Sequence, residues 1–504
     1  MISILFESFF LSLSFISTFK KKQLFVTYFR KRKMFWQLRC DFTSLFSRKN
    51  NSQNHLYPVD GLRAIASLLI ILCHLVTIFS AFVPSYPSIE WQNYIRSVSF
   101  ALSPLMAYAL EIFFMLSGFL LTNKLLIQWR KNSVNYQSFL QEYPLLILKR
   151  ALRFWPGMLL STILMFVCGE PRYPYSDYVF ESFRYISVWF FFQNYIDIEY
   201  WQASLAPLWS VSLDMQVHII LSLLLYLFYS CQKYISIDRS LKILFLLSIV
   251  VSIFLFNPVT MPIILITLRY HTLSLLLPVH FMHWLEINYN LTFPFELQQS
   301  NPMKTFLHRM YLPVEARFGS FITDAILAIH IIHFVPQQDD RNGTRKKYFF
   351  LGLIFLYVIS PMVQSVDNPL QSNFLITLAI ASSRQIFALG QAFILFTALC
   401  PPSHPYHSPW IKRCLSSSIW LPISKLSYLV YLIHWQVSFG LVFGGSLLFL
   451  RAYSVTYAVM ISFPIVLFIS QLISCIWYVL IEKPTERAVK HYLSRYPRTK
   501  TNSQ

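Results

Sequence analysis

Apolar stretches about twenty residues long recur through most of this chain, and no other feature of the sequence constrains its fold as strongly. A helix needs about 20 apolar residues to cross the hydrocarbon core of a bilayer, so each stretch is a candidate span. Of the 504 residues, 55% are hydrophobic and 13% are charged, which leaves no sequence for a soluble domain of any size. The chain is therefore predicted to be an all-α polytopic membrane protein.

Hydropathy predicts about ten transmembrane helices. An even number of crossings returns both flanks to one side of the membrane, and the basic loops then gather on one face, which the positive-inside rule assigns to the cytosol. The net charge of +20 is explained by this topology and not by nucleic-acid binding, because Lys and Arg are divided among short loops. The predicted spans are residues 61–82, 101–122, 145–168, 206–230, 241–256, 315–335, 348–366, 374–400, 421–443 and 455–481.

The segments outside these spans set the domain organisation. Residues 1–19 are apolar and precede a basic cluster, an order that favours an uncleaved anchor over a secretory signal, with an interfacial segment as the alternative. We expect residues 1–56 to hold this apolar segment and a basic cytosolic stretch. Residues 57–489 are expected to form the membrane domain and residues 490–504 a basic cytosolic tail.

The lumenal loop at about 257–314 contains a segment whose path the hydropathy leaves open. Residues 258–282 are apolar enough for a crossing but carry Arg269 and His271, and a crossing would move the next basic loop to the lumen. We therefore expect a lumenal, interfacial or re-entrant segment. The sequon at Asn290 is then lumenal and available for glycosylation.

Seven cysteines are scattered without a close pair, so the sequence indicates neither a zinc site nor a disulfide framework, and no metal is expected. The sequence also contains no Gly-rich phosphate loop and no nucleophile elbow. Candidate functional residues are therefore sought among the polar side chains inside the predicted spans, where an ionisable group is costly and commonly functional.

The first predicted span combines an arginine near one end with a histidine deeper inside. Arg63 and His74 are eleven residues apart, almost three helical turns, so both lie on one helical face, separated by roughly 16 Å along the axis. A histidine in hydrocarbon is expected to face a polar cavity or a partner. The alternative is an imidazole that bonds a neighbouring carbonyl group within the bundle.

The second and third predicted spans each carry a polar pair. Glu111 and Gly118 share a helical face; the carboxylate needs a partner, and the glycine lets another backbone or a ligand approach closely. Packing alone can explain the Ser117–Gly118 pair but explains Glu111 less readily. Arg150 and Arg153 lie one turn apart at the cytosolic boundary of the third predicted span, where they suit either positive-inside anchoring or an anion clamp for phosphate.

The fourth predicted span begins near Trp209 and offers Asp214 and His218 at positions i and i+4. The carboxylate can orient the imidazole there, or each can form a hydrogen bond to another helix. Arg384 and Asp324 each lie well inside a predicted span and need a partner or water, and they can pair with each other.

Taken in order, these residues resemble the acyltransferase type 3 family of membrane proteins, in the animal branch typified by nose-resistant-to-fluoxetine proteins. In size the chain also resembles nematode members described as regulators of hypoxia-inducible factor. The sequence departs from the family at His218, where an aromatic residue is common, and at Asp324, where a small residue is usual. The strings that carry the resemblance are Arg63 with His74; Phe113-Phe-Met-Leu-Ser-Gly-Phe119 with Glu111; Arg150 with Arg153; Leu208-Trp-Ser-Val-Ser-Leu-Asp-Met-Gln216; Tyr311-Leu-Pro-Val-Glu-Ala-Arg317-Phe-Gly319; Arg384; Ser427-Tyr-Leu-Val-Tyr-Leu-Ile-His434; and Glu482-Lys-Pro484.

The resemblance implies transfer of an acyl group from acyl-coenzyme A, a co-substrate and not a bound cofactor, to a hydroxyl of a carbohydrate, lipid or other small acceptor. We expect His74 to act as the general base, with Glu111 or Asp214 orienting it or balancing its charge. The residues expected to hold the phosphates of the coenzyme are Arg63, Arg150 and Arg153. The further candidates are Ser117, Gly118, Trp209, His218, Arg317, Arg384 and His434.

The expected partners are the lipid bilayer, acyl-coenzyme A and an unidentified hydroxyl acceptor, without nucleic acid. The expected location is the endoplasmic reticulum or another endomembrane, with the basic loops and the C-terminus in the cytosol. The alternative is a non-catalytic membrane regulator or lipid carrier that keeps the acyltransferase fold, for example in stress or hypoxia signalling. A transporter is disfavoured because the sequence shows no internal repeat.

Overall fold

The structure is a computed structural model in which every regular element of the described residues is a helix. It describes residues 31–48, 56–79, 108–132, 134–168, 185–195, 207–232, 317–333, 374–402, 406–443 and 455–494, and Ser236, His404, Leu447 and Leu450. The α-helices are α3 (Lys31–Phe46), α4 (Tyr57–Thr77), α8 (Ala109–Asn132), α9 (Tyr136–Cys168), α11 (Trp209–Cys231), α17 (Phe318–His333), α19 (Phe374–Leu399), α20 (Pro409–Leu415), α21 (Trp420–Phe443), α22 (Val455–Trp477) and α23 (Lys483–Ser494). A 3-10 turn, η2 (Gln193–Tyr195), and a π-helical turn, η11 (Tyr478–Glu482), complete the set.

The all-helical fold predicted from the sequence is confirmed within these ranges. Helices α4, α8, α9, α11, α17, α19, α21 and α22 each lie within or overlap a predicted span. The predicted spans 241–256 and 348–366, and the segments 1–19 and 258–282, lie outside the described residues, so the count of about ten stays a prediction. Four described stretches are long and apolar enough to cross a membrane: Tyr57–Thr77, Ala109–Lys131, Trp209–Cys231 and Thr456–Tyr492.

Two helices extend well beyond the boundaries that hydropathy predicts. Helix α8 continues past residue 122 to Asn132, and α9 begins at Tyr136 instead of residue 145. The added turns are rich in Lys, Gln, Glu, Leu and Arg, which favour helix without being apolar. Arg150 and Arg153 consequently lie in the middle of a long helix.

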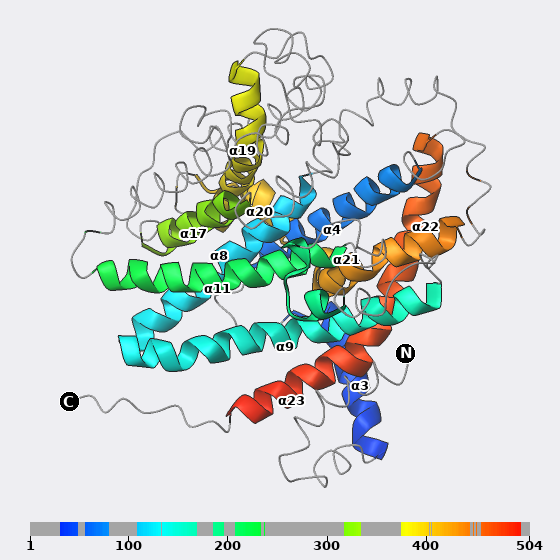
Figure 1. The fold of residues 1–504 in the computed structure, drawn as a ribbon, viewed down its shortest axis with the longest axis horizontal. Helices are drawn as coiled ribbons and strands as arrows, with labels where there is room; N and C mark the ends of the chain where they lie inside the picture. The colour runs from blue at the N-terminus through cyan, green and yellow to red at the C-terminus, as the bar shows by residue number, and fades with distance from the viewer. Residues whose placement is uncertain are drawn as a thin grey trace, which may run out of the picture.

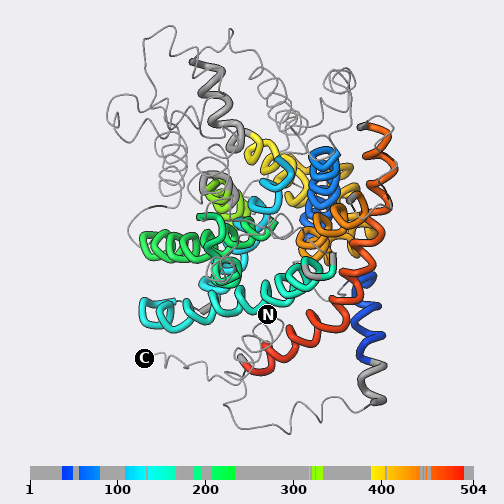
Figure 2. Tube along the Cα trace, turned by 45° about the vertical axis from the view of Figure 1, so that its right-hand side comes forward, coloured from blue at the N-terminus to red at the C-terminus, as the bar shows by residue number. Residues whose placement is uncertain are grey.

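The helices pack into a bundle in which elements distant in sequence lie together. Helix α8 packs on α17, α4 on α21, and α9 on both α11 and α21. In Figure 1, α9 and α11 run side by side, while α4, α21 and α22 occupy the right of the view. Figure 2 shows the same two groups after a turn of 45°. The core that joins α4 to α8, α17, α19 and α20 includes Leu62, Met115, Ala328, Phe387 and Ile411.

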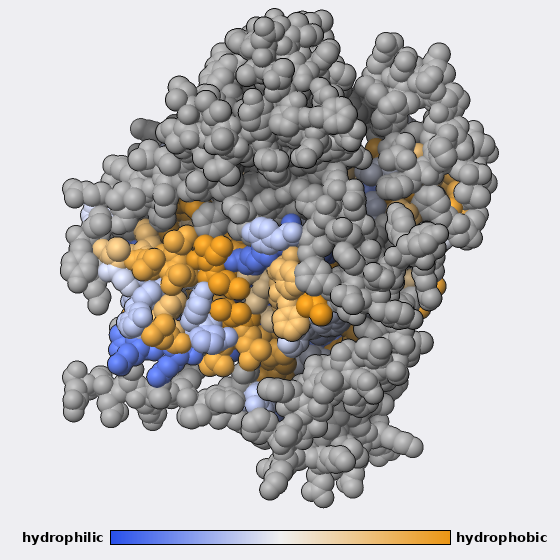
Figure 3. Space-filling view, viewed as in Figure 1, coloured by the Kyte–Doolittle hydropathy of each residue, from blue (hydrophilic) through white to orange (hydrophobic). Residues whose placement is uncertain are grey.

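Apolar side chains also cover part of the outer surface. Figure 3 shows them gathered on the described part of one face, in the region of α9 and α11. The exposed apolar residues of these two helices include Leu148, Ile163, Ile220, Leu223 and Leu227. Apolar surface on helices of this length suits contact with lipid chains.

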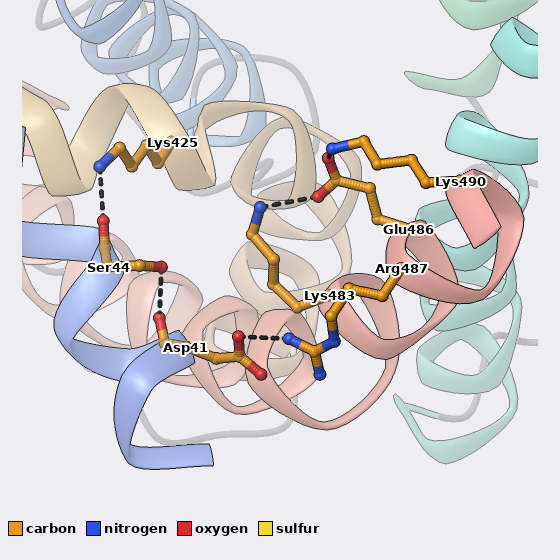
Figure 4. Close-up of polar contacts among 7 residues, drawn as sticks. All are labelled: Asp41, Ser44, Lys425, Lys483, Glu486, Arg487 and Lys490. Carbon is orange, nitrogen blue, oxygen red and sulfur yellow. Dashed lines mark hydrogen bonds and ion pairs between the residues drawn. The ribbon is translucent and has the colours of Figure 1, made fainter. Parts of the chain in front are cut away.

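Helix α3, which lies inside the predicted basic stretch, attaches the N-terminal part of the chain to α21 and α23 (Figure 4). The Asp41 carboxylate accepts a hydrogen bond from Nη1 of Arg487, 2.5 Å away, on α23. The ammonium group of Lys425 donates to the carbonyl oxygens of Ser44 and Ser47, at 2.5 and 2.9 Å. The segment predicted as a separate cytosolic stretch therefore packs against the membrane domain.

Replacing Gly61 by alanine is expected to destabilise the protein by about 1–3 kcal/mol. A Cβ atom at Gly61 would lie 2.7 Å from the Cα atom of Leu415, a backbone atom of α20 that cannot rotate away. Gly157→Ala is the matched control, since a Cβ there would meet side-chain and not backbone atoms, a ring carbon of Tyr428 at 2.6 Å and Cδ1 of Leu432 at 2.9 Å. Thermal unfolding in one detergent compares the two variants, and an equal or larger loss for Gly157→Ala would contradict this prediction.

Candidate active site

Two histidines from segments far apart in sequence meet between α4 and α21. Nδ1 of His74 lies 2.6 Å from Nε2 of His434. The two imidazole planes are parallel within 4°, and the ring centroids are 4.9 Å apart. The indole of Trp435 packs edge-on against His74 at 4.7 Å between centroids. His434 is completely buried and His74 is half-buried.

The structure gives His74 a partner, as the first of the two sequence interpretations expects, and not the neighbouring carbonyl group of the alternative. Its hydrogen-bond partner within the described residues is the imidazole of His434, and neither a carbonyl group nor a carboxylate takes that position. The expected orientation of His74 by Glu111 or Asp214 is therefore not seen, because each carboxylate has an arginine partner of its own.

Asp214 is held by α8 and α9. The Ser117 hydroxyl donates to Oδ1 of Asp214 at 2.5 Å, and Nη2 of Arg150 donates to the Ser117 hydroxyl oxygen at 2.7 Å. The Arg150 guanidinium forms an ion pair with Oδ2 of Asp214, to which its Nε also donates at 3.2 Å. Three helices, α8, α9 and α11, are thus connected by one polar network of the three side chains.

His218 lies one turn beyond Asp214 but does not join this network. The hydrogen bond that the i, i+4 spacing allows is not formed, and neither ring nitrogen of His218 has a hydrogen-bond partner among the described residues. Asp214 faces Arg150 because a hydrogen bond from a guanidinium to a carboxylate is stronger than one from a neutral imidazole. The side chain of His218 is 6% exposed.

The three arginines predicted to hold phosphates lie within electrostatic reach of one another. The charges of Arg153 and Arg150 act on Arg63, together with those of Asp60 and Asp214. Arg63 is half-buried and Arg153 is exposed. We refer to Arg63, Arg150 and Arg153 as the arginine cluster; Arg63 belongs to α4 and the other two to α9.

A second ion pair joins α8 to the start of α17. The Arg317 guanidinium pairs with the Glu111 carboxylate, and each side chain is 1% exposed. The same guanidinium lies over the rings of Phe114 and Trp209, at 5.3 and 4.9 Å from the centroids. Such an aromatic environment favours an arginine by cation–π attraction. This part of the candidate set therefore has a structural role in holding α8, α11 and α17 together.

Of the remaining positions, Gly118 lies at a helix contact, while the side chains of Arg384 and Asp324 lie outside the described residues. The close backbone approach expected at Gly118 is present, since a Cβ atom there would lie 2.8 Å from the carbonyl oxygen of Phe321 on α17. Arg384 lies on α19 and Asp324 on α17, but their side chains lie outside the described residues, and so does their predicted pairing.

Known proteins share sequence features with most of this chain. A family model described as an acyltransferase domain matches residues 56–479. A peptidoglycan O-acetyltransferase, OatA, of Listeria monocytogenes is 27% identical over 187 residues, which are 35% of this chain and 24% of that protein. The chain thus matches about a quarter of the length of this curated relative. No solved structure matches it.

Proposed function

Since this chain belongs to the acyltransferase domain family, we propose that it is a membrane-embedded O-acyltransferase. The proposed donor is acyl-coenzyme A, and the proposed acceptor is a hydroxyl of a carbohydrate, lipid or other small molecule. The similarity to a bacterial O-acetyltransferase supports acyl transfer to oxygen. The proposal includes membership of the animal, nose-resistant-to-fluoxetine-like branch and location in the endoplasmic reticulum or another endomembrane.

The observation that carries the proposal is that the arginine cluster and the histidine pair both lie along α4. Arg63 belongs to the arginine cluster, and the charges of Arg150 and Arg153 act on it. The histidine pair lies at His74, roughly 16 Å further along the same face of α4. Coenzyme A has this construction itself, because its long pantetheine arm separates the phosphates from the thioester. Guanidinium groups suit phosphates, and imidazole suits proton transfer at neutral pH.

In the proposed reaction, His74 takes the proton of the acceptor hydroxyl while the hydroxyl oxygen attacks the thioester carbonyl carbon. The new carbon–oxygen bond forms, the carbon–sulfur bond breaks, and the thiolate of coenzyme A leaves. The protonated imidazole then returns its proton to the thiolate, directly or through water. This mechanism uses a side chain already positioned inside the bundle and needs no covalent acyl-enzyme.

The two arginines of α9 are expected to differ in their effects on donor binding. Arg153→Gln is expected to raise KM for the donor about tenfold without lowering thermal stability, because Arg153 is exposed. Arg150→Gln is expected to lower stability as well, since it leaves Asp214 without its ion-pair partner. Steady-state kinetics and thermal unfolding of both variants measure this difference. A KM unchanged in Arg153→Gln would contradict the phosphate role of that residue.

The proposed function is tested with purified protein in nanodiscs, radiolabelled acetyl- or longer acyl-coenzyme A, and lipid and carbohydrate extracts as acceptors. Chromatography of the products shows where the label goes, and His74→Ala is the control. Label transferred only by the wild type supports an acyltransferase and identifies the acceptor class. Donor binding without turnover across the panel would favour the non-catalytic regulator or lipid carrier instead.

A further inference from the structure

We propose that His434 is a positioning residue that fixes the tautomer of His74, so that Nε2 of His74 presents its lone pair to the acceptor hydroxyl. The expected effect on the rate of acyl transfer rests on the proposed function. The protonation of each ring nitrogen does not, because it follows from the hydrogen bonds of the two rings.

The argument begins at the backbone of α21. Nδ1 of His434 lies 3.1 Å from the carbonyl oxygen of Val430, one turn earlier in the helix. A carbonyl oxygen can only accept, so Nδ1 of His434 must carry a proton and donate it. A neutral imidazole has a single N–H group, and therefore Nε2 of His434 is left as an acceptor.

This acceptor then determines the state of His74. Nδ1 of His74 lies 2.6 Å from Nε2 of His434, so Nδ1 carries the proton in that hydrogen bond. The parallel planes and the centroid separation of 4.9 Å place the hydrogen bond close to the common plane of both rings. His74 is consequently the Nδ1–H tautomer, and its Nε2 has a free lone pair, which is what a general base requires.

A pair of histidines also suits a site inside a membrane better than a pair made of a histidine and a carboxylate. Both rings are neutral before the reaction, so no isolated charge is buried in the resting protein. When His74 takes a proton on Nε2, its hydrogen bond to His434 becomes charge-assisted and stronger. Trp435, packed edge-on at 4.7 Å, limits rotation of the His74 ring.

The test uses His434→Leu and His434→Gln, with His330→Gln as a matched control at an exposed histidine of α17. Leucine removes the acceptor, and kcat is expected to fall about 10²-fold with the donor KM unchanged. Glutamine can place an amide oxygen near the position of Nε2 and is expected to restore kcat to within about tenfold of the wild type. If His434→Leu and His434→Gln are both as stable as the wild type and both keep its full kcat, the positioning role is overturned.

A spectroscopic readout decides the tautomer without any turnover. Solid-state NMR of protein labelled with ¹⁵N-histidine distinguishes a protonated from an unprotonated ring nitrogen, and the signals of each residue are assigned by their loss in His74→Gln and His434→Gln. The expected result is Nδ1–H on both residues in the wild type and a mixed tautomer for His74 in His434→Leu. A proton on Nε2 of His74 in the wild type would overturn the inference, even if the proposed function itself fails.

Discussion

Replacing His74 by glutamine is expected to lower the rate of acyl transfer by about 10²–10⁴-fold, the range in which a positioned general base contributes. Glutamine keeps a polar side chain in the half-buried site and can still bond His434, but its amide accepts no proton at neutral pH. The loss is therefore expected in kcat, with KM for the donor little changed. Steady-state kinetics of wild type and variant at saturating donor measure it.

The control for this prediction is Ser424→Ala, which changes a hydroxyl on α21 that donates to Asp60 at 3.1 Å, away from the histidine pair. Its kcat is expected to stay within about tenfold of the wild type, a change no larger than the loss of one hydrogen bond produces. Full activity of His74→Gln, in a variant that folds and binds the donor, would remove His74 from the reaction.

The largest loss of stability is expected from Glu111→Ala. This change leaves the Arg317 guanidinium, 1% exposed, without its carboxylate partner and lowers the free energy of unfolding by about 3–5 kcal/mol. Thermal unfolding in detergent, or the yield of folded protein, measures the effect. The physical cause is the cost of burying a guanidinium charge that the Glu111 carboxylate balances in the wild type.

The double variant Glu111→Leu with Arg317→Met separates this cause from a simple loss of packing. Removing both charges is expected to restore most of the stability lost in either single variant, because a buried ion pair replaced by apolar groups is often close to neutral. Losses that simply add in the double variant would contradict the assigned role of the pair.

The sequence predicted the helices and much of the α4 face because both depend on local periodicity. Apolar length located α4, α8, α11 and α22, and helical spacing put Arg63 and His74 on one face. Hydropathy did not predict the polar turns of α8 and α9, because it detects only the apolar part of a helix.

The spacing of residues along the sequence could not predict the partners of the site residues. His434 is 360 positions from His74, and Arg317 is 206 from Glu111, so their pairing is decided by how the helices pack. For Asp214 the structure selects the second of the two sequence alternatives, hydrogen bonds to other helices. The spacing of Asp214 and His218 permits a hydrogen bond, but a charged partner on another helix is stronger than a neutral one on the same helix.

The central claim, that the histidine pair performs acyl transfer from a coenzyme A thioester, is tested most directly by counting two products in one sample. Wild type and His74→Gln in nanodiscs receive labelled acyl-coenzyme A and the acceptor extract, and free thiol and acylated acceptor are measured together over time. We predict equal amounts of thiol and acylated acceptor in the wild type, both lost in His74→Gln. Thiol release that is equal in the two proteins, or donor binding without any release, would contradict the claim.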